Sequence, residues 1–258
     1  MTARIFCVAN QKGGVGKTTT TINLGAGLAQ IGRRVLVVDL DPQGNTTMGS
    51  GIDKRRLELS VYDVLLELAG IPEARRRSEK GGYDLLGANR DLAGAEIELV
   101  PLDRRERRLK GALAVVVGDY DFVLIDCPPS LNLLTLNGLT SAHGVIVPMQ
   151  CEYFALEGLS DLVNTIKQVH ANLNRDLEII GLLRVMYDAR ITLQTQVSEQ
   201  LKSHFGDKVF NTVIPRNVRL AEAPSYGTPG VVFDPASKGA IAFVAFAREM
   251  ADRLGKPV

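Results

Sequence analysis

The sequence predicts one doubly wound α/β domain over residues 1–258, with a mostly parallel sheet and helices on both faces. Short aliphatic runs alternate with helix-like stretches along the chain, which is typical of strand–helix–strand units with right-handed crossovers. Hydrophobic residues make up 45% of the chain and aromatic residues only 5%, as suits an aliphatic sheet covered on both faces. A chain of 258 residues is long enough for one large core of this kind.

Composition also limits the function. Lysine and arginine total 30 against 29 aspartate and glutamate, so any binding of nucleic acid must use a local patch of cations. Cys7, Cys127 and Cys151 are isolated in the sequence and are predicted to be buried free thiols. No signal peptide is apparent, and no stretch approaches the roughly 20 apolar residues of a membrane span.

The first predicted strand, residues 5–9, leads into a glycine-rich loop and then a helix over residues 20–30. The loop, residues 12–19, reads KGGVGKTT. Glycines let backbone N–H groups turn toward a polyanion, and the helix that follows adds its positive end. Lys17 can reach the outer phosphates and Thr18 offers a hydroxyl to Mg²⁺. The pattern predicts a site for a magnesium nucleoside triphosphate.

The loop departs from the general pattern G-x-x-x-x-G-K-[ST], because its first position is Gln11 and a second lysine, Lys12, follows. Two lysines in one tight loop cannot easily serve one phosphate chain from the same side. One candidate for Lys12 is the phosphate chain bound by a partner subunit. The alternative is an ordinary glycine-rich turn with two solvated lysines.

The second predicted strand, residues 35–38, is expected to lie beside the first, with Asp39 and Asp41 at its carboxyl end. Ligands of open α/β sheets bind at this edge, so an acid here can orient water or Mg²⁺. The alternative is that residues 41–45 form an Asx-type turn leaving the strand. The glycines in residues 44–51 indicate a segment that can move with a bound phosphate.

Residues 53–82 form a charged insertion with basic triplets at 54–56 and 75–77. Acids flank these triplets or they lie in predicted loops, so we interpret them as solvated surface in preference to a DNA site. Further on, the pattern predicts a strand at 83–87 and helices at 60–68, 92–99 and 103–117. The cations of the last helix spread around more than one face, which argues against a single binding stripe.

A second carboxylate ends the predicted strand at residues 122–125, where Asp126 precedes Cys127 and two prolines. A carboxylate in this position can hold Mg²⁺, directly or through water, opposite the Thr18 hydroxyl. An aspartate that merely ends a strand as a turn residue is the alternative.

The rest of the chain repeats the alternation, with strands predicted at 144–148, 179–185 and 209–214 and helices at 155–173, 192–205 and 236–254. Pro215, Arg216 and Asn217 follow the last strand, again at a carboxyl edge. An amide there could pair with a base edge while proline packs on the ring. From the residues alone, a turn that ends the strand explains them equally well.

Several of these segments resemble the ParA/Soj partition ATPases, which belong to the ParA/MinD class of P-loop proteins with a deviant Walker A loop. The resemblance runs nearly end to end and is carried by residues 12–19, 35–45, 126–130, 214–220 and 222–225. It implies ATP and Mg²⁺ as cofactors and a homodimer that closes over the nucleotides. It assigns catalysis to Lys12 and Asp41 and the metal to Thr18 and Asp126. The nucleotide contacts it implies are Lys12, Gly13, Gly14, Val15, Gly16, Lys17, Thr18, Thr19, Pro215 and Asn217.

The same resemblance implies slow ATP hydrolysis, stimulated by a ParB-type centromere-binding partner, and non-specific binding of double-stranded DNA through Arg190 and Arg219. A cytoplasmic, nucleoid-associated protein without membrane binding is expected. The short segment before the first strand leaves no room for a helix-turn-helix domain, so operator binding is not expected. The alternatives are a MinD-like membrane positioning ATPase, an iron–sulfur carrier ATPase and a metabolic ATP-dependent ligase or synthetase.

Overall fold

A central sheet organises the computed structural model, which describes residues 3–153 and 155–254. In the described residues the sheet has eight strands in the order β3-β4-β2-β5-β1-β6-β7-β8. Every neighbouring pair is parallel except β3 with β4 at one edge. The strands are β1 (Arg4–Val8), β2 (Val35–Asp39), β3 (Arg76–Ser78), β4 (Tyr83–Leu86), β5 (Phe122–Asp126), β6 (Gly144–Met149), β7 (Glu178–Tyr187) and β8 (Val209–Pro215).

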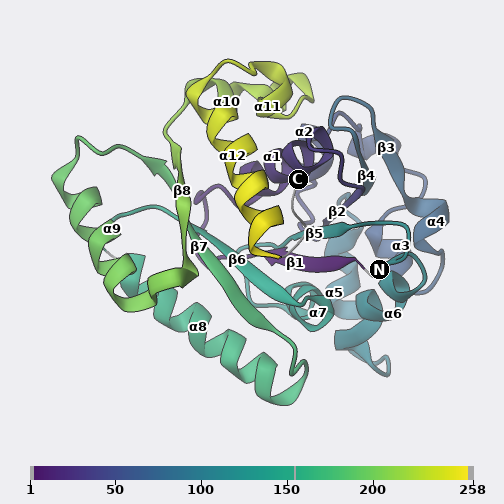
Figure 1. The fold of residues 1–258 in the computed structure, drawn as a ribbon. Helices are drawn as coiled ribbons and strands as arrows, with labels where there is room; N and C mark the ends of the chain where they lie inside the picture. Colours follow the sequence, from purple (N-terminus) through teal and green to yellow (C-terminus); the bar gives the residue numbers. More distant parts are fainter. Residues whose placement is uncertain (1–2, 154, 255–258) are drawn as a thin grey trace.

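Helices connect these strands and cover both faces of the sheet (Figure 1). The α-helices are α1 (Lys17–Gln30), α2 (Asn45–Gly49), α3 (Val61–Leu65), α4 (Ile71–Ala74), α5 (Leu92–Glu98), α6 (Arg108–Ala114), α7 (Leu133–Ser141), α8 (Ala155–Asn172), α9 (Thr192–Phe205), α10 (Val218–Glu222), α11 (Gly230–Phe233) and α12 (Lys238–Arg253). The 3-10 turns are η1 (Lys54–Arg56), η2 (Arg105–Arg107), η3 (Gly206–Lys208) and η4 (Ala223–Tyr226).

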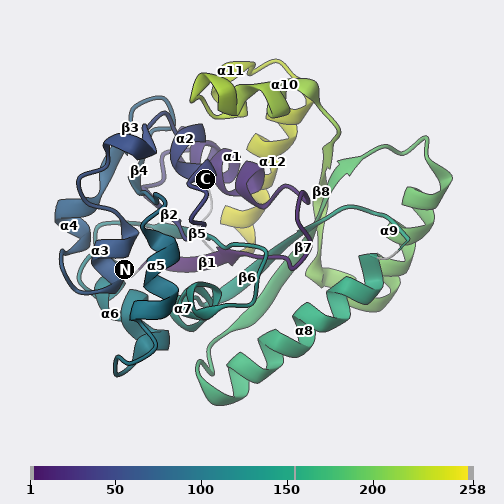
Figure 2. The ribbon, with the colours of Figure 1, turned by 180° about the vertical axis from the view of Figure 1, so that it is seen from behind.

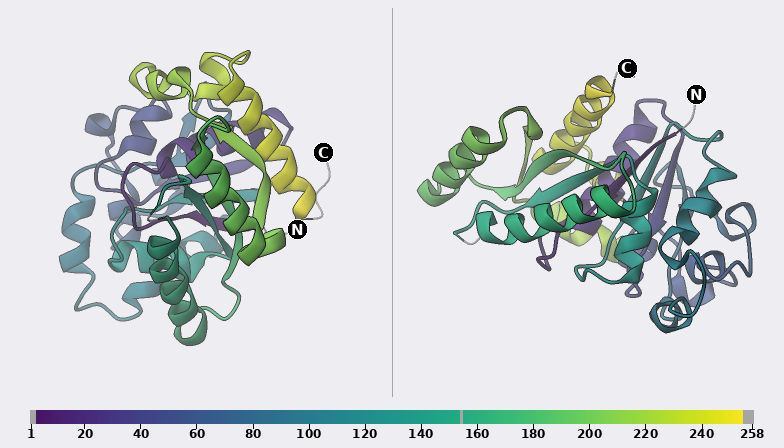
Figure 3. Two further views of the ribbon diagram at one scale, coloured as in Figure 1. Left: turned by 90° about the vertical axis from the view of Figure 1, so that its left-hand side faces the viewer. Right: turned by 90° about the horizontal axis from the view of Figure 1, so that it is seen from below.

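Alternate residues of each strand serve two separate cores. Phe6 and Val8 of β1 pack with α1 and α12, whereas Ile5 and Cys7 pack in the other core, with α3 and α5 to α9. Figure 2 shows α1, α10, α11 and α12 grouped on one side, and in the right-hand view of Figure 3 α12 and α8 lie on opposite sides of the sheet. Burial on both faces explains why the strands are continuous aliphatic runs. The predicted fold class is confirmed.

One prediction about the sheet is wrong. The second strand was expected beside the first, but β5 lies between β1 and β2 and pairs with both. Strand order is decided by which apolar faces pack together across the whole chain, and no local pattern encodes it. The consequence is local: Asp39 at the end of β2 stands in register with Asp126 at the end of β5.

Two predicted helices are shorter than their sequence patterns. The helix expected at 60–68 ends at Leu65, shortly before Glu67, which has a φ of +60°. The helix expected at 103–117 begins only at Arg108, after Arg104 with a φ of +53° and the turn η2. A left-handed residue cannot continue an α-helix.

The expectations about the cysteines and the last helix agree with the structure. All three cysteines are buried and free. The helix predicted at 236–254 is present as α12 and buries Phe243, Phe246 and Met250 against the sheet. The expectation of no membrane binding concerns in part the C-terminal tail, residues 253–258, of which residues 255–258 lie outside the described residues. No helix in the described part of the chain combines the length and apolar character needed to span a bilayer.

Glu249 of α12 binds the backbone of the edge strand β8. Its carboxylate accepts hydrogen bonds from the N–H groups of Asn211 and Thr212 at 2.7 and 2.8 Å. Burial by itself would raise the pKa of Glu249, but these bonds and the charge of Arg253 outweigh it and lower the pKa. A lowered pKa in the folded state stabilises the protein above the unfolded pKa, and this stabilisation is lost as the pH falls through the folded value.

We therefore expect Glu249→Gln to lower the free energy of unfolding by about 1–2 kcal/mol at neutral pH, since bonds to a charged group are the stronger ones. The difference from the parent should shrink as the pH falls through the lowered folded-state pKa of Glu249, because the carboxyl group then becomes protonated and loses its charge. Urea unfolding at pH 7 and pH 3.5 measures it. Glu199→Gln is the control, because Glu199 is exposed on α9. Equal losses for both variants would contradict the role of Glu249.

Candidate functional site

The loop between β1 and α1 has the backbone that its glycines predict. Gly14 and Gly16 have φ values of +73° and +78°, in the left-handed region that favours glycine. Gly16 is also the N-cap of α1, and no side chain caps this helix end in the described structure. The first N–H groups of α1 are therefore open to a ligand. Together with the positive end of the helix dipole they form an anion site.

Lys17 lies inside this loop with only 8% of its surface exposed. Its Nζ donates a hydrogen bond to the backbone carbonyl of Lys12 at 3.1 Å. Burial lowers the pKa of Lys17, and the carboxylates of Asp126 and Asp41 oppose this shift. The side chain thus bends back along the loop, and its ammonium group is placed beside the backbone N–H groups that would meet the same phosphate chain.

Thr18 and Asp126, the predicted metal residues, are in contact. The Thr18 hydroxyl donates to Oδ2 of Asp126 at 2.7 Å. A second threonine, Thr46 of α2, donates to the same oxygen at 2.6 Å. Sequence reasoning missed Thr46, although its place shortly after Asp41 in the glycine-containing segment was a usable signal. Hydroxyl and carboxylate oxygens are the hard donors that suit Mg²⁺.

The other strand-end carboxylate, Asp39, is fully buried. Its Oδ2 accepts hydrogen bonds from the backbone N–H and hydroxyl of Thr47 at 2.9 and 2.7 Å, and its Oδ1 accepts the N–H of Asp41 at 3.1 Å. Burial raises the pKa of Asp39 and of Asp126, and the negative charge of Asp126 raises that of Asp39 further. A cation at this edge would relieve both carboxyl groups.

The residues at this edge fit magnesium held jointly with phosphate better than a site made by protein alone. No group of three or more His, Cys, Asp or Glu residues suited to a metal occurs in the described residues. Mg²⁺ is usually held by one or two carboxylates together with substrate phosphates and waters. Thr18 and Asp126 supply such a partial ligand set.

Asp41 has no hydrogen bond to Thr18 or Asp126 in the described structure and is held within its own turn. Its Oδ1 accepts the N–H of Gln43 at 2.9 Å, so the Asx-type turn considered as an alternative is present. The side chain is half-buried, and its charge influences both Lys17 and Asp126. The turn and a role in orienting water are compatible, because the turn engages only one carboxylate oxygen.

Lys12 points away from Lys17. Its Nζ forms an ion pair with Oε2 of Glu152 at 2.6 Å, and both side chains are about half exposed, at 52% and 45%. An exposed ion pair is worth about 0–1 kcal/mol, so Glu152 holds Lys12 only weakly. The structure separates the two lysines as the sequence predicts, and Glu152 is a partner that no sequence pattern indicated.

A cavity of about 290 Å³ opens beside the start of α1. Pro215 and Asn217, the predicted base contacts, both line it. Oδ1 of Asn217 is already engaged, because it caps α10 by accepting the N–H groups of Arg219 and Leu220 at 2.8 and 3.3 Å. The amide NH₂ group remains as the available donor. The other lining residues include Val185, Met186 and Phe243, which sequence reasoning did not identify.

The two arginines predicted to bind DNA each pair with acidic residues of the protein. Arg190 is 90% exposed and paired with Asp188 at 2.7 Å, and this pairing lowers the pKa of Asp188 to about 2. Arg219 on α10 is held by Glu222 at 2.9 Å and Asp234 at 3.4 Å. A shallow depression contains Arg190 together with two cations that sequence reasoning missed, Arg216 and Lys238.

The basic triplets at 54–56 and 75–77 are engaged within the protein. Arg55 binds Asp53 through two hydrogen bonds of 2.9 and 3.0 Å. Arg75 donates to the hydroxyl of Tyr120 at 2.6 Å, and Arg77 pairs with Asp84. These cations thus have acidic or hydroxyl partners within the protein, and their interpretation as solvated surface stays a prediction.

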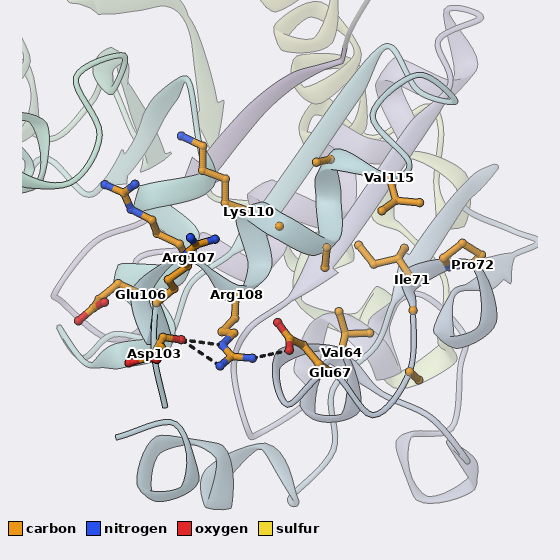
Figure 4. Close-up of a pocket in the computed structure, with 16 residues that line it drawn as sticks. Val64, Glu67, Ile71, Pro72, Asp103, Glu106, Arg107, Arg108, Lys110 and Val115 are labelled. Atoms are coloured by element: carbon orange, nitrogen blue, oxygen red, sulfur yellow. Dashed lines mark hydrogen bonds and ion pairs between the residues drawn. The ribbon is translucent and has the colours of Figure 1, made fainter. Parts of the chain in front are cut away.

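The volume of a cavity, taken alone, would favour a different site from the one beside α1. A larger groove, about 1100 Å³, lies between α3, α4 and α6, far along the chain from the glycine loop. Figure 4 shows Arg108 crossing it to meet Glu67, with Ile71 and Val115 on one side. This groove has neither a glycine loop nor paired strand-end carboxylates. The chemistry therefore favours the smaller cavity beside α1.

The parallel sheet, the glycine loop with its extra lysine and the carboxylates at strand ends define a P-loop protein of the deviant Walker A class. A family model described as an AAA domain matches residues 3–179. The chain belongs to the ParA/Soj family of partition ATPases, as its relatives show. Soj of Bacillus subtilis is 54% identical over 96% of this chain and 98% of its own length, and ParA of Caulobacter vibrioides is 50% identical over 97% and 94%. The predicted family is confirmed.

A solved structure of high similarity has a different name. It is cobyrinic acid a,c-diamide synthase from Mycobacterium smegmatis with bound ADP and magnesium, 44% identical to this chain, with a TM-score of 0.87 over 98% of this chain and 96% of that one. The fold is therefore shared with a nucleotide-bound protein that carries a metabolic name.

The side chain of Asn217 caps α10 through Oδ1 and is predicted to contact a base through its amide NH₂ group. Substitutions that keep only one of these groups test the two roles separately. Serine is also a good N-cap but has no amide, so Asn217→Ser should unfold like the parent while binding a fluorescent ATP analogue several-fold more weakly. Asn217→Ala should lose both properties and be less stable by about 1 kcal/mol. Urea unfolding and nucleotide titration measure the two effects. A serine variant with parental nucleotide affinity would remove the amide from the base contact.

Proposed function

We propose that this protein is a magnesium-dependent ATPase that partitions DNA. The observation that carries the ATPase proposal is the Thr18–Asp126 hydrogen bond beside Lys17 at the uncapped end of α1. That arrangement joins a phosphate site to a metal site, and a structurally similar chain was obtained with ADP and magnesium. Partition is supported by full-length similarity to Soj and ParA.

In this proposal Lys17 and the N–H groups of residues 13–19 bind the β- and γ-phosphates, and Thr18 and Asp126 would hold Mg²⁺. The metal, when bound, neutralises charge on the phosphates. Asp41 orients the attacking water from its turn beside Asp126. Hydrolysis of this kind needs positioning and charge neutralisation, and no covalent intermediate on the protein.

The ATP-bound form is proposed to be a homodimer in which Lys12 reaches the phosphates of the partner subunit. The ion pair with Glu152 supports this, because it keeps the ammonium group extended away from its own loop. The pair is half-exposed, so exchanging Glu152 for a triphosphate costs little and gains a stronger, charge-assisted contact.

DNA is the proposed ligand of the arginines. The chain is close to neutral, at +1, so a bulk field does not attract DNA. Arg190, Arg216 and Lys238 form one local cluster, and Arg219 lies on α10 nearby in sequence. Each pairs weakly or not at all with acids in the described structure, so phosphate oxygens can compete. Binding should be independent of sequence and steeply dependent on salt.

A ParB-type protein is the proposed partner that stimulates hydrolysis, and cytoplasmic, nucleoid-associated localisation follows from DNA binding. The second candidate is a metabolic synthetase, which the name of the similar M. smegmatis structure favours. Steady-state ATPase assays decide between them. Stimulation by non-specific DNA with a ParB-like N-terminal peptide supports partition, whereas turnover that depends on cobyrinic acid supports a synthetase.

Removal of the Lys12 side chain should prevent dimer formation while nucleotide binding persists. We expect light scattering in saturating ATPγS and Mg²⁺ to give two chains for the parent and one for Lys12→Ala, because repulsion between facing phosphates is no longer offset. Lys110→Ala, an exposed lysine on α6, is the control and should dimerise. A Lys12→Ala variant that dimerises like the parent counts against the contact across the interface.

Arg190→Ala and Arg219→Ala should each weaken DNA binding in ATPγS and reduce the slope of log affinity against log salt by about 1 per contact and monomer. Arg55→Ala is a matched control, since Arg55 pairs with Asp53 at i−2 as Arg190 pairs with Asp188. Fluorescence anisotropy with a random duplex at several salt concentrations measures the slopes. An arginine whose loss leaves affinity and slope unchanged is not a DNA contact.

A further inference from the structure

Thr46 and Thr47 attach α2 to the two buried carboxylates at the strand ends, Asp126 and Asp39. We call this part of the sheet, with its two carboxylates, the metal edge. Thr46 donates to Asp126 at 2.6 Å and Thr47 to Asp39 at 2.7 Å. Both threonines are fully buried, so these are strong contacts in a medium of low dielectric. The Thr46 hydroxyl shares Oδ2 of Asp126 with the hydroxyl of Thr18. A change in the groups bound to Asp126 would therefore alter the hydrogen bond from Thr46 that holds α2 in place.

The other end of α2 touches the segment that carries Asn217 and Arg219. A Cβ atom on Gly227 would lie 2.9 Å from Cα of Gly51, and one on Gly51 would lie 2.8 Å from the carbonyl oxygen of Gly227. Both glycines also have left-handed φ values, +84° and +55°. The two backbones are thus in direct contact, with no side chain between them to absorb a movement. A displacement of α2 must displace η4 and, with it, α10.

The neighbouring helix α11 packs against α10, since a Cβ atom on Gly230 would lie 2.4 Å from Cδ2 of Leu220, and it has a second anchor on α1. Asn23 of α1 accepts the N–H of Val231 at 2.9 Å, and its amide donates to the carbonyl of Thr19 at 2.8 Å. This ties α11 to the helix that follows the glycine loop. Arg219 bridges the two units, since its guanidinium binds Glu222 on its own α10 and Asp234 at the end of α11. A shift of α10 relative to α11 changes the Arg219–Asp234 contact first, because 3.4 Å is the longer of the two.

We infer that Thr46 is a positioning residue that couples the metal carboxylate Asp126 to Arg219, through α2 and the Gly51–Gly227 contact. When Asp126 turns toward a bound metal, Thr46 and α2 follow, η4 and α10 move with them, and Arg219 separates from Asp234 and becomes available to a phosphate. This inference rests on the proposed function of Arg219 as a DNA contact. It gives a physical route by which one loaded protomer alters its DNA surface before any partner subunit is in place.

The test compares Thr46→Val, which has nearly the same shape without the hydroxyl, with Thr46→Ser, which keeps the hydroxyl. Thr140→Val is the matched control, because the Thr140 hydroxyl is buried in α7 with no hydrogen-bond partner in the described structure. Hydrogen exchange of residues 218–228 is measured with and without saturating ATPγS and Mg²⁺, at protein concentrations where the chain is a monomer. DNA anisotropy is measured in parallel.

We expect the nucleotide to change the exchange rates of residues 218–228 by about threefold or more in the parent, Thr46→Ser and Thr140→Val. Thr46→Val should bind nucleotide but show no such change, and its DNA affinity should fall about tenfold. An exchange response in Thr46→Val equal to that of the parent overturns the coupling. A parent that never binds DNA refutes the proposed function instead, while its exchange response still tests the coupling.

A second pair of variants tests the far end of the route without touching the metal edge. Gly227→Ala forces the two backbones apart, whereas Gly32→Ala carries the same left-handed penalty at a φ of +81° with nothing within 4 Å of the added atom. Gly227→Ala should bind nucleotide normally and lose the exchange response, and Gly32→Ala should keep it. Thermal unfolding confirms that both are folded. Equal responses in the two glycine variants would overturn the inference.

Discussion

The position of β5 between β1 and β2 is the constraint on which the site depends. It sets Asp126 next to the strand that leads into the glycine loop and in register with Asp39 on the other side. Two carboxylates buried on adjacent strands cannot both carry charge cheaply, and burial raises the pKa of each. Hydroxyl and N–H groups from α1, from α2 and from the loop at Asp41 donate hydrogen bonds to them. These hydrogen bonds offset part of the cost of burying Asp39 and Asp126 side by side.

The cations that face outward are held in a different way. Lys12, Arg190 and Arg219 each have an acidic partner, but these pairs are exposed, and exposed pairs contribute little to stability. They keep long side chains in defined directions and can exchange their partner for a phosphate. The buried threonine–carboxylate bonds cannot exchange in this way. The protein therefore combines buried, hydrogen-bonded carboxylates at the strand ends with surface cations whose acidic partners can be exchanged.

Several residues serve the fold and the site together. Asn217 caps α10 with one atom and offers the other to the cavity beside α1. Asp41 forms a turn and still presents a carboxylate to Lys17. The structural and functional interpretations of such residues were posed as alternatives from sequence, but a side chain with two polar atoms can satisfy both. This explains why turn chemistry alone did not discriminate between them.

The sequence by itself determined the fold class, the glycine loop, the strand-end carboxylates and the family, because these depend on local periodicity and on residue types at short spacing. It also separated Lys12 from Lys17 on steric grounds. The tertiary structure alone decided the strand order, the contact of Thr46 with Asp126, the partner Glu152 and the breaks at Glu67 and Arg104. Those features depend on which distant segments pack against one another, and a hydrogen bond between residues 80 positions apart leaves no periodic trace in the chain.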